Sequence, residues 1–287
     1  MIDVHSHLLP GIDDGSENME ISLSLAQDAV RDGITHALMT PHHMNGRFTN
    51  HPADVIRLTD EFQHELDQQG IPLTVFPSQE VRINGDLLTA WDNQDLMTTD
   101  EGGHYMLLEF PHDAVPTFTD DMVFQLEQRG VTPVFVHPER NEDLMAHPEK
   151  LFELIQKGAY AQITASSYVG TFGKKVERFA EDIIDHGLGH MLASDAHHIK
   201  NRDYEMSAAF KKLIGAYGND VGKMFDDNAK AIVNGDPVHR VAETPIKKKR
   251  HTKSKDRGQA SVPGEATFLR HKWAILVWTV YLLRGRV

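Results

Sequence analysis

The chain has 287 residues, 40% of them hydrophobic and 25% charged, a composition that excludes a disordered protein and allows one large domain or two small ones. It has no cysteine, which excludes a disulfide framework, a zinc–thiolate site and catalysis by a thiolate. Residues 1–240 contain 39 acidic and 18 basic residues, a net charge of −21, which makes them a poor partner for the phosphate backbone of a nucleic acid.

The N-terminus and the histidine content give two further indications. The segment Met1–His5 has neither a basic region nor an apolar stretch, so we expect no signal peptide and a cytoplasmic location. The chain has 18 histidines without a poly-histidine run, and this excess indicates metal or proton chemistry.

Short apolar runs rich in β-branched residues alternate with amphipathic stretches from the N-terminus to about residue 235. The pattern predicts seven strands, near 2–5, 34–39, 73–80, 104–109, 132–137, 159–164 and 190–194. It predicts helices between them, near 18–31, 52–69, 119–129, 148–157, 172–187 and 204–216. A glycine such as Gly70 or Gly130 follows several of these helices, at the position where a left-handed residue ends a helix. The alternation predicts an α/β fold with parallel strands over residues 1–240.

Residues of metal-binding type stand at the carboxyl ends of six of the seven predicted strands. They are His5 and His7, His42, Glu80, Glu109, His137, and Asp195 with His197. Seven βα units can close into a barrel or lie open as a doubly wound sheet, but only a closed barrel brings all of these strand ends to one mouth. We therefore expect a barrel.

The spacing of these residues favours metal binding. His5 and His7 lie two apart in an extended segment, so both side chains leave the same face, and Asp195 and His197 repeat the spacing. The turn at Asp13–Gly15 returns a carboxylate toward this region. Each residue alone is equally well explained as an exposed polar group, but the six strand ends together favour ligands. Nitrogen and oxygen ligands without sulfur suit manganese, iron or zinc, and their number indicates at least two ions.

Multimetal sites of this type hydrolyse phosphate esters, so a phosphatase is the favoured function. Arg140 and Arg202 follow presumed ligands closely, where a guanidinium can bind non-bridging phosphate oxygens. An exposed loop cation explains either arginine alone. A non-catalytic, metal-stabilised interaction module is the alternative from a different class.

Seven segments of the chain match, in order, the motifs of one superfamily. They are Asp3–Gly15, Thr40–His43, Gln79–Glu80, Leu108–Pro111, His137–Asn141, Gln162–Thr164 and Ala193–His197. The chain thereby closely resembles the PHP (polymerase and histidinol phosphatase) superfamily, and in particular the bacterial capsule and exopolysaccharide tyrosine-protein phosphatases of the CpsB/CapC/YwqE type. The resemblance covers residues 1 to about 240.

The resemblance implies a distorted seven-stranded (β/α)7 TIM-like barrel and a three-metal site that uses manganese, with iron or zinc as alternatives. His5, His7, Glu80 and Asp195 would hold one ion, Glu80, Glu109 and His137 a second, and Asp14, His42 and His197 a third. It also implies phosphate contacts from Arg140 and Arg202, and a tyrosine autokinase of the polysaccharide export machinery as substrate. Within the superfamily, a small-molecule phosphatase acting on histidinol phosphate is the alternative, and a single-stranded-DNA exonuclease is disfavoured because the domain is acidic.

Residues 241–287 form a basic and then apolar tail that we expect to lie outside the barrel. Its apolar run, Trp273–Leu283, is too short to span a bilayer but long enough to lie in a membrane interface between flanking basic residues. Binding to a partner, or a tail with no selected role, are the favoured alternatives. Any membrane contact would be made through this tail.

Overall fold

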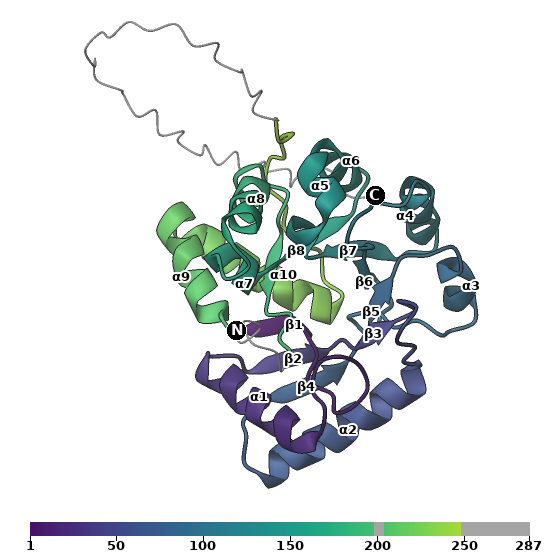
Figure 1. The fold of residues 1–287 in the computed structure, drawn as a ribbon, viewed down its shortest axis with the longest axis vertical. Helices are drawn as coiled ribbons and strands as arrows, with labels where there is room; N and C mark the ends of the chain where they lie inside the picture. Colours follow the sequence, from purple (N-terminus) through teal and green to yellow (C-terminus); the bar gives the residue numbers. More distant parts are fainter. Residues whose placement is uncertain (198–203, 248–287) are drawn as a thin grey trace, which may run out of the picture. The chain divides into compact units, whose positions relative to one another are not determined.

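The computed structural model describes residues 1–197 and 204–247, in which parallel strands and helices alternate (Figure 1). The first half contains β1 (Ile2–Ser6), α1 (Met19–Arg31), β2 (His36–Met39), β3 (His42–His43), α2 (Pro52–Gln68), β4 (Thr74–Pro77), β5 (Glu80–Arg82), α3 (Leu87–Asp92) and β6 (Tyr105–Glu109). The second half contains α4 (Thr119–Gln128), β7 (Thr132–Val136), the 3-10 helix η1 (Pro138–Arg140), α5 (Glu142–Ala146), α6 (Glu149–Gln156), β8 (Tyr160–Thr164), α7 (Ala165–Val169), α8 (Lys174–Asp185), β9 (Met191–Ala193), α9 (Met206–Tyr217) and α10 (Asn219–Asn234).

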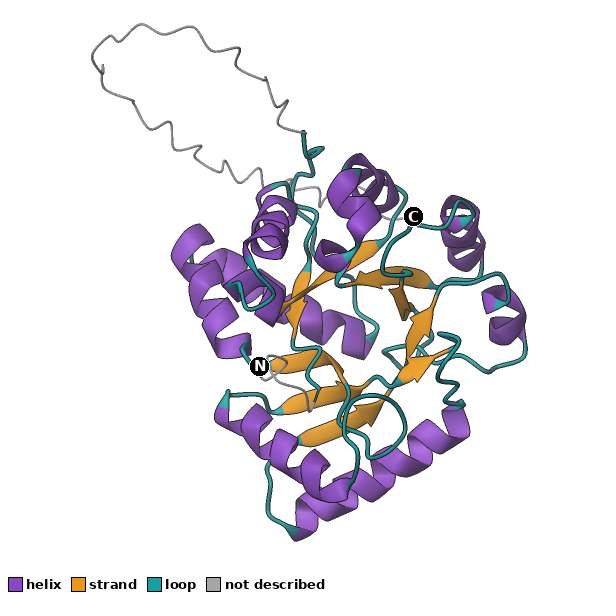
Figure 2. Cartoon of the chain, in the orientation of Figure 1, coloured by secondary structure: helices purple, strands orange, loops and turns teal. Residues whose placement is uncertain are grey.

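The strands form two parallel sheets. One has the order β1-β2-β4 and the other the order β3-β5-β6-β7-β8-β9. The sheets approach each other where β1 lies beside β9, because Ser6 forms a parallel bridge with Ala196 and Asp195 N–H donates to the His5 carbonyl at 2.8 Å. In Figure 2 the strands surround a common centre and most helices lie outside them, whereas α10, labelled in Figure 1, lies across the ring. The expected α/β class with parallel strands is confirmed.

The described residues contain nine strands rather than the seven expected, because a short extra strand follows the expected strand at 34–39 and the expected strand at 73–80 is divided. The strand expected at 34–39 begins at His36, breaks at Pro41, which has no N–H to donate, and resumes as β3. The strand expected at 73–80 divides into β4 and β5 at Ser78 and Gln79. The two breaks are adjacent, since Ser78 N–H donates to the Met39 carbonyl at 2.9 Å.

Two apolar cores fix the position of the strand ends. The larger packs the strands against the outer helices and includes Phe62 of α2 and Phe135 of β7. The smaller lies inside the ring of strands, where Val4 of β1 and Leu107 of β6 join Ile232 of α10. Tyr105 and Met191, at the amino ends of β6 and β9, belong to this inner core, so α10 covers the amino ends of the strands and leaves their carboxyl ends open.

The C-terminal part of the described chain packs on the body beyond the expected boundary at 240. Thr244 N–H donates to the His186 carbonyl at 3.0 Å, and Ile246 is only 8% exposed. The compact unit runs from Met1 to Lys248. Arg202 and residues 248–287, including the apolar run of the tail, lie outside the described residues.

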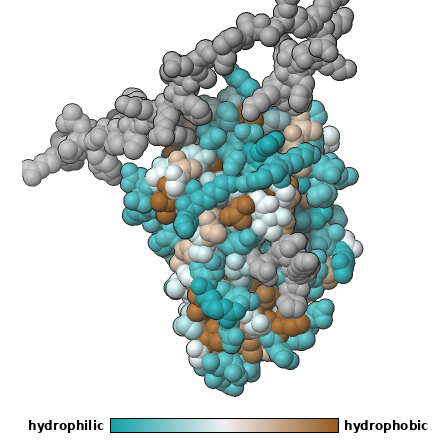
Figure 3. Space-filling model, turned by 60° about the vertical axis from the view of Figure 1, so that its left-hand side comes forward, coloured by the Kyte–Doolittle hydropathy of each residue, from teal (hydrophilic) through white to brown (hydrophobic). Residues whose placement is uncertain are grey.

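The surface agrees with the acidic, polar composition. The face in Figure 3 is mostly hydrophilic, with small and separate apolar areas. Among the residues that the structure describes, no helix combines the length and the apolar character needed to cross a membrane.

Candidate metal centre

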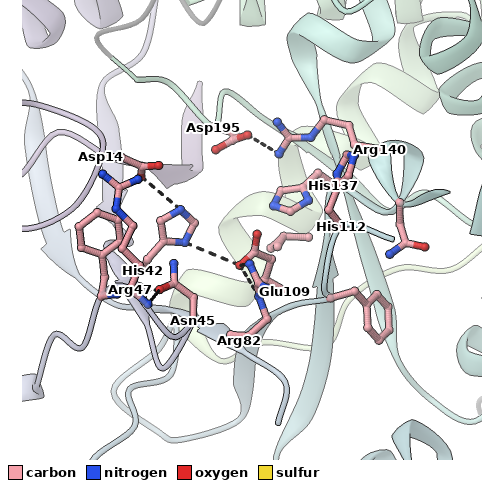
Figure 4. A pocket seen from close by; sticks show the side chains of 14 residues that line it. Asp14, His42, Asn45, Arg47, Arg82, Glu109, His112, His137, Arg140 and Asp195 are labelled. Carbon is pink, nitrogen blue, oxygen red and sulfur yellow. Dashed lines mark hydrogen bonds and ion pairs between the residues drawn. The ribbon is translucent and has the colours of Figure 1, made fainter. Parts of the chain in front are cut away.

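The structure brings all nine candidate ligands of the sequence analysis together at the carboxyl ends of the strands. We call these nine residues the His–carboxylate cluster: His5, His7, Asp14, His42, Glu80, Glu109, His137, Asp195 and His197. A cavity of about 390 Å³ opens onto them, lined by Asp14, His42, Glu109, His137 and Asp195 (Figure 4). The remaining four lie behind it and are at most 1% exposed.

Four donor atoms converge most closely in the buried part of the cluster. His5 Nε2 lies 3.1 Å from His7 Nε2 and 3.4 Å from Glu80 Oε2. Asp195 Oδ1 lies 3.6 Å from His5 Nε2 and 3.5 Å from His7 Nε2. These are the four residues expected to hold the first ion.

The outer part of the cluster groups its residues partly as expected. Asp14 Oδ1 lies 3.4 Å from His42 Nε2 and 3.6 Å from His197 Nε2, and His7 belongs to the same group. Glu80 and Glu109 group with His42 rather than with His137, because His42 Nδ1 lies 2.8 Å from Glu80 Oε2. His137 Nε2 contacts the other Glu80 oxygen at 2.7 Å.

Tight backbone geometry places several of these side chains. Gly15 lies so close to His7 that a Cβ atom at this position would overlap the His7 carbonyl oxygen and Cβ, so the turn that returns Asp13 and Asp14 requires glycine. His137 and Asp195 have left-handed backbones, with φ of 37° and 50°. A non-glycine residue in this region is strained, and such strain concentrates at functional sites.

The Nδ1 atoms of three cluster histidines face oxygen acceptors. His7 Nδ1–H donates to Asp13 Oδ2 at 2.6 Å, His5 Nδ1–H to Gln162 Oε1 at 3.0 Å, and His197 Nδ1–H to the Asp195 carbonyl at 3.0 Å. Each ring therefore presents Nε2 to the cluster, the orientation that a metal-binding imidazole requires. The sequence analysis did not find Gln162 as a functional residue, and it treated Asp13 only as part of a turn.

Burial and charge act against each other in the cluster. Burial opposes protonation of His7, but Asp13 and Glu80 raise the pKa of its ring to about 9. Burial likewise opposes protonation of His42, but Glu80 and Asp14 raise its pKa to about 11. Burial, together with the Glu80 charge, raises the pKa of Glu109 to about 6. The carboxylates thus demand positive charge, which protons supply in the absence of a cation.

The donor set fits a divalent cation. Bonds of about 2.0–2.2 Å to nitrogen and oxygen put neighbouring ligand atoms roughly 3.0–3.5 Å apart. The Nε2 atoms of His5 and His7 lie 3.1 Å from each other and 3.4–3.6 Å from Glu80 Oε2 and Asp195 Oδ1, which is close to this spacing. Glu80 Oε2 and Asp14 Oδ1 are buried and accept no hydrogen bond within the described part of the chain. Two Nε2 atoms at 3.1 Å repel each other unless a proton or a cation lies between them.

Two arginines lie beside the cluster. The Arg140 guanidinium forms an ion pair with Asp195 Oδ2, as Figure 4 shows, and lies 5.5 Å from the centre of the Phe172 ring. Arg82, which the sequence analysis did not single out, contacts Glu109 Oε2 at 2.7 Å. Arg202 lies outside the described residues, so the structure gives no position for it.

Comparison with known proteins shows the family to which the chain belongs. The model of the family described as "Capsular polysaccharide synthesis, CpsB/CapC" matches residues 1–234. The chain belongs to the CpsB/CapC family. Its CpsB/CapC relatives include the tyrosine-protein phosphatase YwqE of Bacillus subtilis (strain 168), 36% identical over 250 residues, which are 87% of this chain and 98% of YwqE. CapC of Staphylococcus aureus is 31% identical over 245 residues, 85% of this chain and 95% of CapC.

The CpsB/CapC assignment extends to solved structures. A crystal structure from work on YwqE of Bacillus subtilis and CpsB of Streptococcus pneumoniae, described as metal-dependent tyrosine phosphatases, superimposes with a TM-score of 0.82 at 36% identity and covers 86% of this chain and 100% of that one. A histidinol phosphate phosphatase of Lactococcus lactis reaches a TM-score of 0.50 at 14% identity, which shows a similar fold alone. The predicted family and its phosphatase enzyme class are confirmed.

Proposed function

We propose that this chain is a protein-tyrosine phosphatase whose substrate is a tyrosine autokinase of the polysaccharide export machinery. The single observation that carries the proposal is that the buried Nε2 atoms of His5 and His7 lie 3.1–3.6 Å from each other and from carboxylate oxygens of Glu80 and Asp195, in a CpsB/CapC chain. The relatives named as tyrosine-protein phosphatases match nearly the whole described chain, which supports the same reaction here.

We propose manganese as the metal, with iron or zinc as alternatives, and three ions in the cluster. His5, His7, Glu80 and Asp195 would hold the first, Glu80, Glu109 and His137 the second, and Asp14, His42 and His197 the third. Bound ions of this kind lower the pKa of water and neutralise the charge that develops on a transferred phosphoryl group. In a domain as acidic as this one, they also supply the local positive field that a phosphate requires.

The residues around the ions would orient the substrate. Arg140 lines the cavity and is 19% exposed, so its planar guanidinium can turn from Asp195 to the phosphate oxygens when Asp195 is occupied by a cation. Arg202 would act in the same way. Asp13 and Gln162 would hold His7 and His5 in the tautomers that leave Nε2 free.

We also propose that the two sheets form one distorted seven-stranded barrel, ending near residue 240. The adjacent breaks at Pro41 and Ser78, and the bridge from Ser6 to Ala196, support a ring of seven chain segments in which β2–β3 and β4–β5 each count once.

Comparison of two substrates tests the proposed function. With manganese added, the enzyme should hydrolyse a phosphotyrosyl peptide from the autokinase with a higher kcat/KM than histidinol phosphate. Glu80→Ala, which removes a carboxylate facing His5, His7, His42 and His137, should lower metal content and rate more than His42→Ala. Full activity after exhaustive chelation, or a higher kcat/KM for histidinol phosphate, would contradict the proposal.

A further inference from the structure

The loop of residues 44–50, between β3 and α2, forms one wall of the cavity and is held rigidly there. We call it the rim loop. Asn45 Oδ1 accepts hydrogen bonds from the N–H groups of Arg47 and Phe48, at 3.0 and 2.7 Å. Asn50 Nδ2 donates to the His42 carbonyl at 2.8 Å and so joins the end of the loop to a residue of the cluster. These bonds hold the backbone from which Arg47 and Phe48, together with Asn45, face the cavity.

Phe48 stands beside the cluster in a defined orientation. Its ring is parallel to the His42 ring within 7°, with 6.2 Å between the ring centres. The cluster itself is polar. Phe48 provides an apolar surface in the part of the cavity next to the cluster, where we expect the phosphate to bind. The ring of a phosphotyrosyl group is joined to phosphorus through a single ester oxygen, so a phosphate bound at the cluster would bring that ring to the part of the cavity that Phe48 lines.

Arg47 differs from the other arginines of the cavity. Arg82 is paired with Glu109 and Arg140 with Asp195. Arg47 forms no ion pair with any residue of the described ranges 1–197 and 204–247, and its guanidinium lies 4.7 Å from the centre of the Phe48 ring (Figure 4). In a body with a large excess of acidic residues, this exposed cation at the cavity mouth would attract an acidic group on the substrate.

Resting on the proposed phosphatase function, we propose that the rim loop determines specificity: Phe48 packs against the ring of the phosphotyrosyl group, and Arg47 pairs with an acidic side chain beside it in the peptide. A phosphoseryl group has no ring to reach Phe48. A contact between two aromatic rings changes the affinity for a ligand by about 2- to 12-fold, beyond the effect of burying the ring. An exposed ion pair changes this affinity by up to about fivefold.

The ring contact is tested with two phosphonates that share one anionic head. The metal-loaded protein should bind phenylphosphonate more tightly than methylphosphonate, measured by calorimetry, and Phe48→Leu should reduce that preference about 2- to 12-fold. Phe48→Tyr should retain the preference, and metal content should not change. Phe124→Leu, at a 54% exposed phenylalanine on α4, is the matched control.

The charge contact is tested with two phosphotyrosyl peptides that differ by glutamate or glutamine next to the phosphotyrosine. The parent should prefer the glutamate peptide, in kcat/KM, by a factor that falls with added salt. Arg47→Gln should remove the preference, whereas Arg57→Gln, at an exposed arginine on α2, should retain it.

The outcomes separate this inference from the proposed function. A parent that hydrolyses phosphotyrosyl peptides but binds both phosphonates equally, or a Phe48→Leu variant with an unaltered preference, would overturn the specificity role alone. Equal preference for the glutamate peptide in the parent and in Arg47→Gln would overturn the charge contact. A parent that hydrolyses no aryl phosphate overturns both the function and the inference.

Discussion

Two imidazole rings of the His–carboxylate cluster, His7 and His5, are oriented by side-chain acceptors that do not line the cavity, Asp13 and Gln162. Asp13 lies six residues from His7, but Gln162 lies 157 residues from His5. Most ligand-type residues were predictable because they follow an apolar run at the end of a predicted strand, whereas Asp14 lies in a turn and was named from the family resemblance. The acceptors were not, because a glutamine inside β8 looks like any other strand residue until the fold brings it against β1.

Replacing Asp13 with asparagine should weaken metal binding. An amide can turn its NH2 group toward His7 Nδ1, which would reverse the tautomer and put a hydrogen on Nε2. We expect a loss of about 10- to 100-fold in metal affinity, as for other groups that orient metal-binding histidines. Competition with a chelator measures it, and Asp95→Asn, which removes the partner of His51 outside the cluster, should bind as the parent does. Unchanged affinity in Asp13→Asn would contradict the orienting role.

Replacing Arg140 with lysine tests phosphate orientation. Lysine keeps the charge but loses the planar pair of donors, so kcat/KM on an aryl phosphate should fall about 10-fold or more, a loss of about 1.4 kcal/mol or above. Metal stoichiometry should stay constant. Arg202→Lys should behave in the same way. A variant that sheds metal while its phosphate affinity is unaltered would show that the arginine holds Asp195 instead.

The strands were predictable as elements, but their breaks were not. Apolar runs located β1, β6, β7, β8 and β9 to within a few residues. Pro41 has no N–H to donate, which accounts for the first division, but the position of the second beside it depends on the pairing of the two segments, since Ser78 N–H donates to the Met39 carbonyl. The side chain of Gln79 turns away from the ladder to donate to the Asn50 carbonyl, at 2.6 Å.

His190 joins three elements and should make stability depend on pH. Its Nδ1 accepts from Ala161 N–H at 3.2 Å, and its carbonyl accepts from Asn228 of α10 at 2.9 Å. Burial, assisted by the charge of Arg240, lowers the pKa of this ring to about 3. The ring therefore stays neutral in the folded state, while in the unfolded state it takes a proton below about pH 6.5.

The contribution of His190 to stability should consequently fall as the pH drops from about 6.5 toward 3. The contribution lost by pH 5 is about 2 kcal/mol. Denaturant unfolding at pH 7.5 and pH 5 measures the loss, which should be smaller in His190→Asn, because the amide oxygen can replace Nδ1 as the acceptor without titrating. His64→Asn, on the exposed side of α2, should keep the loss of the parent. An identical loss in His190→Asn and the parent would show that the ring does not titrate in this way.

At the scale of the whole molecule, the sequence predicted where the chemistry lies but not what closes the ring of strands. The helix-like pattern near Asp227–Val233 was visible, yet only the fold shows that Ala229 and Ile232 pack inside the ring against Val4 and Leu38. Similarly, nothing in the short, irregular sequence of residues 241–247 marks Ile246 as a core residue. Both features depend on contacts between distant parts of the chain.

Truncation locates the end of the folded unit. A chain that stops after Lys247 should keep its thermal midpoint and its kcat on a small aryl phosphate, because the cluster and both cores are then complete. A chain that stops after Val241 loses the Thr244–His186 hydrogen bond and the burial of Ile246, and should be less stable by about 1.5–3 kcal/mol. Calorimetry of the two truncations and the full chain checks both expectations. A large loss of stability or of kcat in the chain that ends at Lys247 would show that the tail is part of the folded domain.

The contact between β1 and the segment after β9 also sets the time at which the metal centre can form. Ser194 N–H donates to the Asp3 carboxylate at 2.9 Å across 191 residues of sequence. At about 5–20 residues per second, the ribosome needs roughly 10–40 s to synthesise that stretch. Throughout this interval His5 and His7 have emerged without Asp195 and His197, and β1 has β2 but not its second neighbour. Cation capture by the complete donor set therefore has to wait until the segment after β9 has left the ribosome, and a chain stalled before that point would expose an incomplete metal site and an open strand edge to chaperones.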